Sequence, residues 1–196
     1  MKTAFQFVLP AIAAMALMSC TTITPETSTS AKIKHGVPGG QVVQTQKITA
    51  TVTGIDAAKR EVTFVSRDGK KFKVKAGPEV VNFHQIRIGD QLNITLTEKI
   101  VIRLAKKGEK TKDGSATLIG LAPVGDKPGA VVADAHQVTA VVTAIDLKKH
   151  QATLQFADGS STTVNVRQDV DLTKHNVGQK VVIQTTEVYA IMVEKP

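Results

Sequence analysis

The side chains that could support acid–base, metal or nucleophilic chemistry are few in this sequence, and their spacing does not bring them together. No two of the five histidines stand at the spacing of metal ligands: they are His35, His84, His136, His150 and His175. Asp56 and Asp146 occupy predicted turns, where Asp ordinarily bonds the backbone. The sequence has no glycine-rich phosphate loop, nucleophile elbow or zinc-protease motif. We therefore expect a protein that is not an enzyme and uses no cofactor or metal.

The single cysteine, Cys20, follows a short apolar segment with Lys2 near its start. A lone cysteine cannot form an intrachain disulfide. The stretch Leu17-Met18-Ser19-Cys20 resembles the lipobox of bacterial lipoproteins, in which an obligatory cysteine ends the signal peptide. That resemblance implies a signal peptide over residues 1–19 and attachment of lipid to Cys20. Three acyl chains would hold the mature protein firmly on a membrane.

The residues after Cys20 bear on the predicted localisation of the protein. Thr21 stands where an Asp would favour retention in the inner membrane, so the lipoprotein resemblance implies an outer-membrane anchor with the chain facing the periplasm. Residues 20–36 are rich in Thr, Ser, Pro and Lys. This composition predicts a flexible tether that holds the folded part away from the bilayer.

The rest of the chain contains an internal duplication. The stretch 48–69 returns as 138–159, with Asp68-Gly69 matched by Asp158-Gly159 at the same offset. A repeat of this length predicts two copies of one structural unit. We assign residues 37–105 to repeat 1 and residues 127–196 to repeat 2, joined by a linker over residues 106–126.

Each repeat has the alternation of apolar and polar residues that is typical of half-buried strands. Repeat 1 predicts strands near 48–56, 61–66 and 71–76, then a short helical turn within 77–86. Further strands follow around Leu92 to Leu96 and Ile100 to Leu104. The alternation places Val52 and Phe64 in the core of repeat 1, and Val142 and Leu154 in the core of repeat 2.

This order of elements predicts an all-β protein made of two tandem five-stranded OB-like barrels. SH3-like barrels are the alternative. In the linker, the segment 117–121 predicts an added strand that pairs with Val101 to Leu104.

The repeats resemble small periplasmic β-barrel proteins whose strands open with the pattern Val-x-Gly-Ile-Asp. In outline they also resemble the periplasmic copper and silver metallochaperone, an OB-like barrel that binds metal through a His, two Met and a Trp. This chain has no Trp, and Met192 is the only Met after the signal peptide. The resemblance therefore implies the fold and not a metal site.

Charge separates the two repeats. Residues 42–105 hold eleven Lys and Arg against six Asp and Glu, whereas residues 134–196 hold six against seven. Lys71, Lys73 and Lys75 alternate along one predicted strand and share its outer face. Either they form a solvated strand face that deters edge pairing, or they are candidate anion-binding residues. Nucleic acid is not an expected partner, because this face lacks aromatic residues for base stacking.

The sequence thus predicts a membrane-anchored periplasmic lipoprotein that acts as a non-catalytic binding or envelope-scaffold module. Repeat 1 would contact an anionic envelope component or an envelope protein. Two alternatives remain: a carrier or sensor of a small ligand or metal, and an accessory of an envelope enzyme.

Overall fold

A computed structural model of the chain describes residues 23–123 and 125–196. The protein is all-β, as predicted. Its ten strands are β1 (Glu26–Lys32), β2 (Gly39–Asp56), β3 (Glu61–Ser66), β4 (Lys71–Lys75), β5 (Gln91–Leu104), β6 (Gly114–Leu121), β7 (Gly129–Asp146), β8 (Gln151–Phe156), β9 (Ser161–Asn165) and β10 (Lys180–Glu194). Two short 3₁₀ helices are also present: η1 (Phe83–Gln85) lies within the helical turn predicted at 77–86, and η2 (Leu172–Lys174) has the matching place in repeat 2.

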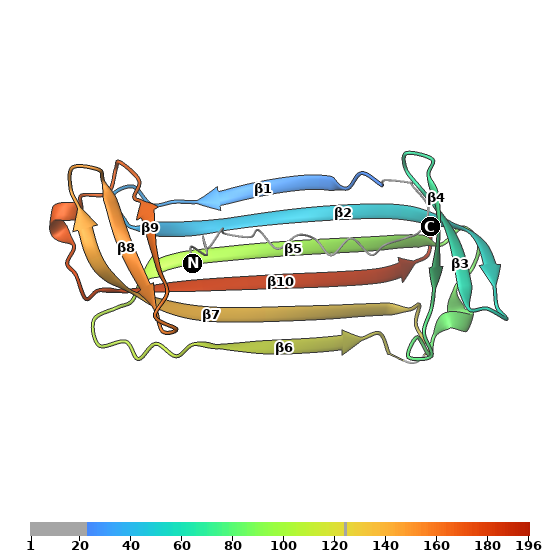
Figure 1. Cartoon of the computed structure of the whole chain (residues 1–196). Helices are drawn as coiled ribbons and strands as arrows, with labels where there is room; N and C mark the ends of the chain where they lie inside the picture. Colours follow the sequence, from blue (N-terminus) through green and yellow to red (C-terminus); the bar gives the residue numbers. More distant parts are fainter. Residues whose placement is uncertain (1–22, 124) are drawn as a thin grey trace, which may run out of the picture.

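All ten strands belong to one antiparallel sheet that does not close. Its order is β4-β3-β2-β5-β10-β7-β8-β9, with β1 added beside β2 and β6 added beside β7. Four long strands, β2, β5, β10 and β7, run from one end of the molecule to the other (Figure 1). Between the two ends, the sheet is a single layer of six strands bordered by β1 and β6.

A small folded unit sits at each end of this sheet. Head 1 consists of β3, β4 and η1 with the adjoining ends of β2 and β5, and head 2 consists of β8, β9 and η2 with the adjoining ends of β7 and β10 (Figure 1). A register shift interrupts β2 between Val52 and Gly54 and β7 between Val142 and Ala144. Such bulges bend a strand, so both heads leave the long sheet at the same place in the repeat.

The prediction of two separate five-stranded barrels is wrong. The expected fourth and fifth strands of repeat 1 form one strand, β5, which pairs with β10 from end to end. No turn residue separates Leu96 from Ile100, and the apolar positions keep the same phase across Glu98, so the strand continues. Its second half leaves head 1 and reaches head 2.

The continuous strands exchange core residues between the repeats. Val193, at the end of β10, is buried in the core of head 1. Leu104, at the end of β5, packs against the core of head 2. Each head is therefore completed by a strand end from the other repeat, and neither head is built from one repeat alone.

The predicted hairpins and core residues are confirmed. The β3–β4 and β8–β9 hairpins turn at Asp68-Gly69 and Asp158-Gly159, and the turn glycines have positive φ angles of 79° and 82°. Val52, Phe64, Val142 and Leu154 are all buried. The period-two pattern was sufficient to assign these side chains to the core.

Two expectations for the connecting segments are corrected. Residues 26–32, expected within the tether, form β1 and pair with the open edge of β2. The extra strand of the linker, β6, pairs with β7 and not with Val101 to Leu104. The reason is that β5 already has β2 on one side and β10 on the other, so it has no free edge.

Candidate functional site

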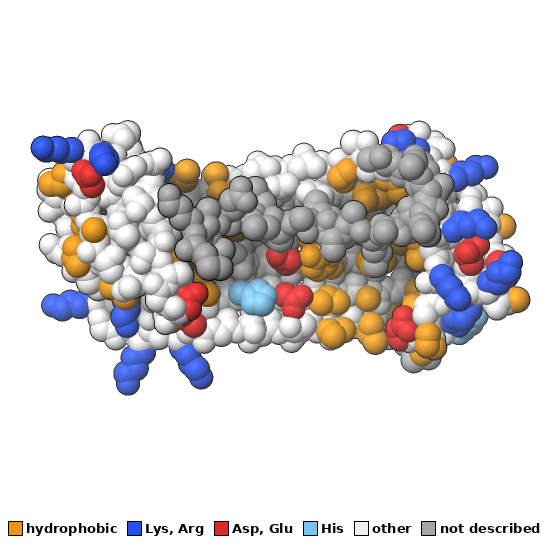
Figure 2. Space-filling view, viewed as in Figure 1, with side chains coloured by type: hydrophobic (Ala, Val, Ile, Leu, Met, Phe, Trp, Pro, Cys, Tyr) orange, Lys and Arg blue, Asp and Glu red, His pale blue; other side chains and the backbone are white. Residues whose placement is uncertain are grey.

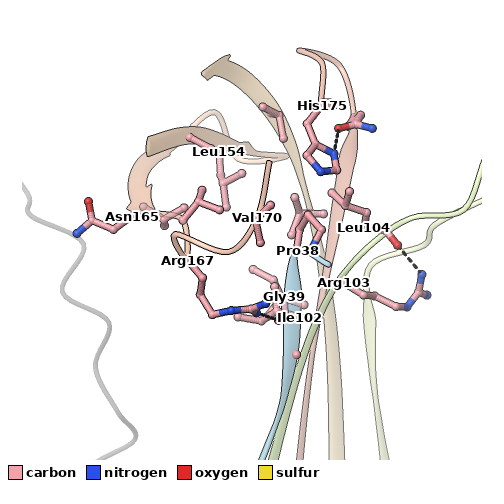
Figure 3. Close-up of a pocket in the computed structure, with 18 of the residues that line it drawn as sticks. Pro38, Gly39, Ile102, Arg103, Leu104, Leu154, Asn165, Arg167, Val170 and His175 are labelled. Atoms are coloured by element: carbon pink, nitrogen blue, oxygen red, sulfur yellow. Dashed lines mark hydrogen bonds between the residues drawn. The ribbon is translucent and has the colours of Figure 1, made fainter. Parts of the chain in front are cut away.

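Head 2 contains an apolar cavity of about 350 Å³ between its hairpin and the ends of the long strands (Figure 3). Its walls come from β8, β9, the segment around η2, and the ends of β2, β5, β7 and β10. Leu154 and Val170 line its interior, and Ile102 and Leu104 line it from the sheet. Cavities of this size and character are typical of small-molecule sites.

The cavity exists because the repeats differ at matched core positions. In head 1, Phe64 stacks on Phe72 with ring centroids 5.4 Å apart, and Phe83 is buried in the same cluster. The matching residues in head 2 are all smaller: Leu154, Thr162 and Leu172. Phe156, which stands in the place of buried Ser66 and packs against the core of head 2, returns one ring. Protein interiors are packed as densely as organic crystals, so the net loss of two aromatic rings leaves space unless the backbone closes in.

The backbone of head 2 keeps the geometry of head 1. Val142 pairs with Leu154 as Val52 pairs with Phe64, and the bulge follows at the same position. Val142 also exchanges hydrogen bonds with Gly178 and Gln179, as Val52 does with Gly89 and Asp90. Because this frame is held by hydrogen bonds and by the long strands, the smaller side chains leave an open cavity.

A second difference lies in the turn that begins each hairpin. Arg60 donates to the carbonyl groups of Ala76, Gly77 and Val80, and its guanidinium lies 4.9 Å from the centre of the Phe83 ring. The matching residue, His150, reaches only the carbonyl of Arg167 among the described residues, at 3.1 Å. In head 1, Arg60 therefore holds the segment after β4 against the core. Head 2 has no long cationic side chain at this position.

Two polar groups stand at the wall of the cavity. His175 Nδ1 lies 3.2 Å from Gln179 Oε1, and both residues line the cavity (Figure 3). His175 stands in the place of Ile86, a core residue of head 1, and Gln179 stands in the place of buried Asp90. A ligand with one polar end would find its hydrogen-bonding partners here.

The base of head 1 is closed by an ion pair that head 2 does not have. Asp90 is 3% exposed and pairs with Lys127, which also donates to the carbonyl of Gln85 at 2.8 Å. In the other repeat, Val37 stands in the place of Lys127, and Gln179 stands in the place of Asp90. A neutral, partly apolar pair therefore replaces two charges at the open head.

The mouth of the cavity is framed by two arginines whose charges are already compensated. Arg167 lies 2.9 Å from Asp169, donates to the carbonyl groups of Lys34 and Val37, and so holds the loop before β2 against head 2. Arg103 pairs with Glu109 at 2.6 Å. The Arg103 guanidinium, helped by the backbone N–H of Lys106, lowers the pKa of Glu109 to about 2.

Arg167 likewise holds the pKa of Asp169 well below its usual range, and the backbone N–H of Gly36 adds to the effect. Both carboxylates are therefore ionised at neutral pH, and each balances its arginine. The mouth has little net charge, and the interior is apolar. This combination favours a neutral or weakly polar hydrophobic ligand over an anion.

The sheet between the heads carries carboxylates on neighbouring strands. Glu98 is opposite Glu187, which is opposite Asp134, and acidic side chains and a histidine are visible there in Figure 2. Tyr189 donates to Glu187 at 2.8 Å, and this bond is the main cause of its raised pKa. Within residues 23–123 and 125–196, no group of three or more His, Cys, Asp or Glu side chains is arranged to hold a metal ion.

The predicted site residues fall elsewhere. Lys71, Lys73 and Lys75 lie on β4 of head 1 with exposed side chains, and Lys73 forms an ion pair with Glu61 at 2.8 Å. This pair raises the pKa of Lys73. Cys20 and the rest of the lipobox lie outside the described residues. None of the helical segments that the structure describes could cross a membrane.

The cavity residues were missed from the sequence. His175 was not predicted to take part in ligand binding. The signal that could have found the site is the loss of volume at matched core positions of the two repeats, including Val62, which is matched by Ala152.

No protein-family model matches this chain, and no curated protein sequence is similar to it at a significant level.

Proposed function

We propose that this protein is a non-catalytic binding module of the bacterial envelope that holds a hydrophobic ligand in head 2. The ligand class is a fatty acyl chain or an apolar small molecule of similar volume. The observation that carries the proposal is the apolar cavity of about 350 Å³ at a place where head 1 has a filled core.

The size and lining of the cavity limit what can occupy it. A dry apolar cavity of roughly 150 Å³ is enough to bind benzene, so this cavity has room for about twice that volume. Water is a poor occupant, because a buried water needs several polar partners. His175 and Gln179 provide a pair of neutral polar groups in the wall, which suits the hydroxyl end of an otherwise apolar chain.

Binding of fatty alcohols with six to twelve carbons would test this proposal, measured by isothermal titration calorimetry on the purified protein. Fatty acids of the same lengths carry a negative charge at neutral pH and should bind more weakly than the alcohols. Leu154→Phe restores the side chain of head 1 and should weaken binding at least tenfold. The matched control is Val65→Leu in head 1, which lies far from the cavity and should leave affinity unchanged. If no member of the series binds, or if Leu154→Phe binds as tightly as the wild type, the proposal is wrong.

We also propose that the protein is anchored by lipid on Cys20 in the outer membrane and faces the periplasm. The support is the Leu17-Met18-Ser19-Cys20 motif. Cys20→Ala should release the protein into the soluble periplasmic fraction or leave the signal peptide uncleaved. Fractionation of Cys20→Ala with outer membranes at the wild-type mature mass would contradict the anchor.

A second candidate function concerns head 1, where Lys71, Lys73 and Lys75 alternate on one exposed strand. They offer a shallow basic surface for an anionic envelope component such as a phosphorylated glycolipid. Lys73 is already paired with Glu61, so the positive charge of this surface is smaller than the sequence suggested. We rank it below the cavity as a binding site.

A further inference from the structure

Among residues 23–123 and 125–196, the sheet has four edge strands without a second neighbour, and they are protected unequally. Natural proteins blunt an open edge with charged side chains, prolines, bulges or very short strands, because an unprotected edge pairs with other chains. The edge strand β4 carries three lysines, β9 has only five residues, and β1 is polar and contains Glu26 and Lys32. Each of these three edges has one of the usual protective features.

The fourth edge, β6, has none of them. It has eight residues, Gly-Ser-Ala-Thr-Leu-Ile-Gly-Leu, without a charge, a proline or a break in its pairing with β7. Leu118, Ile119 and Leu121 are each about two-thirds exposed. In Figure 1 no element lies outside β6, and in Figure 2 hydrophobic side chains gather on the part of the sheet where β6 and β7 lie.

The backbone of β6 offers hydrogen bonds on its open side. Ala122 donates to Gly129, at the start of β7, and residues of an antiparallel strand alternate in the side to which their N–H and C=O groups point. The backbone groups of Ser115, Thr117, Ile119 and Leu121 therefore point away from β7. Their hydrogen-bonding capacity is available to another strand.

We propose that β6 pairs antiparallel with β6 of a second copy of this chain, so that one continuous sheet crosses a two-fold axis. A register centred on Leu118 places Ser115 opposite Leu121 of the other copy and Thr117 opposite Ile119. All of these are the outward-facing residues, and each such pair exchanges two backbone hydrogen bonds. No outward backbone group within Ser115 to Leu121 is left unpaired.

The side chains and charges fit the same arrangement. The two Leu118 side chains meet at the axis in a non-hydrogen-bonded pair, where facing side chains approach most closely. The basic segment 106–112, with Lys106, Lys107, Lys110 and Lys112, lies at opposite ends of the paired strands and extends toward Asp126 of the other copy. Parallel pairing would place the two basic segments side by side. The strand is thus self-complementary in the antiparallel sense, as an isologous interface requires.

The register can be tested by disulfide cross-linking of the full-length protein in detergent. All variants carry Cys20→Ser, so that one introduced cysteine is the only thiol. Leu118→Cys should give a covalent dimer upon mild oxidation with copper–phenanthroline, because two Leu118 positions face each other. Ser28→Cys, at the centre of the β1 edge, is the matched control and should remain at least tenfold less cross-linked.

Sedimentation equilibrium gives a second measurement without a cross-link. Leu118→Lys places two like charges at the axis and should raise the dimer dissociation constant at least tenfold, whereas Ser28→Lys should leave it unchanged. Leu118 is exposed, so circular dichroism should show an intact fold for both. A protein that stays monomeric at all concentrations, or one whose association is weakened equally by both variants or only by Ser28→Lys, would overturn the proposal.

Discussion

Head 1 and head 2 have the same backbone and different interiors. Head 1 contains stacked Phe64 and Phe72, buried Phe83, the Arg60 clamp and the Asp90–Lys127 ion pair. Head 2 has smaller or neutral residues at every one of these positions and a cavity in their place. The comparison teaches that one copy of a duplicated unit can stay tightly packed, while the other copy carries smaller side chains on the same frame and leaves an apolar cavity.

The largest expected effect is the loss of an aromatic ring from the packed head. Phe64→Ala should lower the free energy of unfolding by about 3 to 5 kcal/mol, because it removes a buried side chain and leaves a cavity. Leu154→Ala should cost less, about 2 kcal/mol, since that side chain already borders empty space. Chemical denaturation of both variants measures the difference, and equal costs would show that the two interiors are packed alike.

The second largest effect on stability is expected from breaking the buried Asp90–Lys127 ion pair. Lys127→Met leaves Asp90, which is 3% exposed, without its cation, and should destabilise the protein by about 2 to 3 kcal/mol, because an unpaired buried charge is costly. Val37→Met, at the matching position, is the control and should change the free energy of unfolding by less than about 0.5 kcal/mol. A small effect of Lys127→Met would mean that head 1 does not depend on this pair for closure.

A smaller effect is expected at the lysines of β4. Replacing Lys71, Lys73 and Lys75 with the residues of repeat 2, Ser, Thr and Asn, should weaken binding of an anionic glycolipid about 3- to 10-fold at low salt. The difference should shrink as salt rises, because exposed charges are screened beyond about 8 Å at physiological ionic strength. Fluorescence titration measures the affinity.

The double variant Lys148→Ser, Lys149→Ser in repeat 2 serves as the control for that titration. It removes two positive charges from the other end of the molecule and should not alter the affinity. Equal weakening by both sets of substitutions would indicate attraction by net charge and would remove any special role for β4.

The smallest effect concerns the mouth of head 2. Glu109 has a pKa of about 2 in the folded protein, below the ordinary value of about 4.3 for an unfolded chain. Its contribution to stability is therefore fully present above about pH 4.3 and is lost as the pH falls through about 2.

An NMR titration of the Glu109 side-chain carboxyl carbon should give a midpoint near 2. Arg103→Gln should return that midpoint toward 4.3, because the guanidinium is the main cause of the shift. An unchanged midpoint in Arg103→Gln would show that the Arg103–Glu109 pair does not form in solution.

Local features of this protein could be predicted from its sequence alone. Alternation assigned Phe64 and Leu154 to the core, Asp68-Gly69 and Asp158-Gly159 marked the hairpins, and the duplication predicted that the same hairpin occurs twice. These features depend on neighbours within a few residues, since side chains alternate along a strand and a tight turn needs particular residues. For the same reason, the pattern could place Lys71, Lys73 and Lys75 on one face of a strand but not detect the partner Glu61 of Lys73.

Only the tertiary structure decided how the strands are shared and where the cavity lies. A run such as Leu92 to Leu104 has the same alternation whether it folds back on its own repeat or continues toward the other. The choice depends on pairing with β10, whose residues lie between 77 (Leu104 with Val181) and 101 (Leu92 with Val193) positions further along the chain. The cavity depends on side chains from several strands that meet in three dimensions, among them Leu104 from one repeat and Leu154 from the other. Strand pairing between distant segments and the volume left between their side chains are non-local properties, so no local pattern contains them.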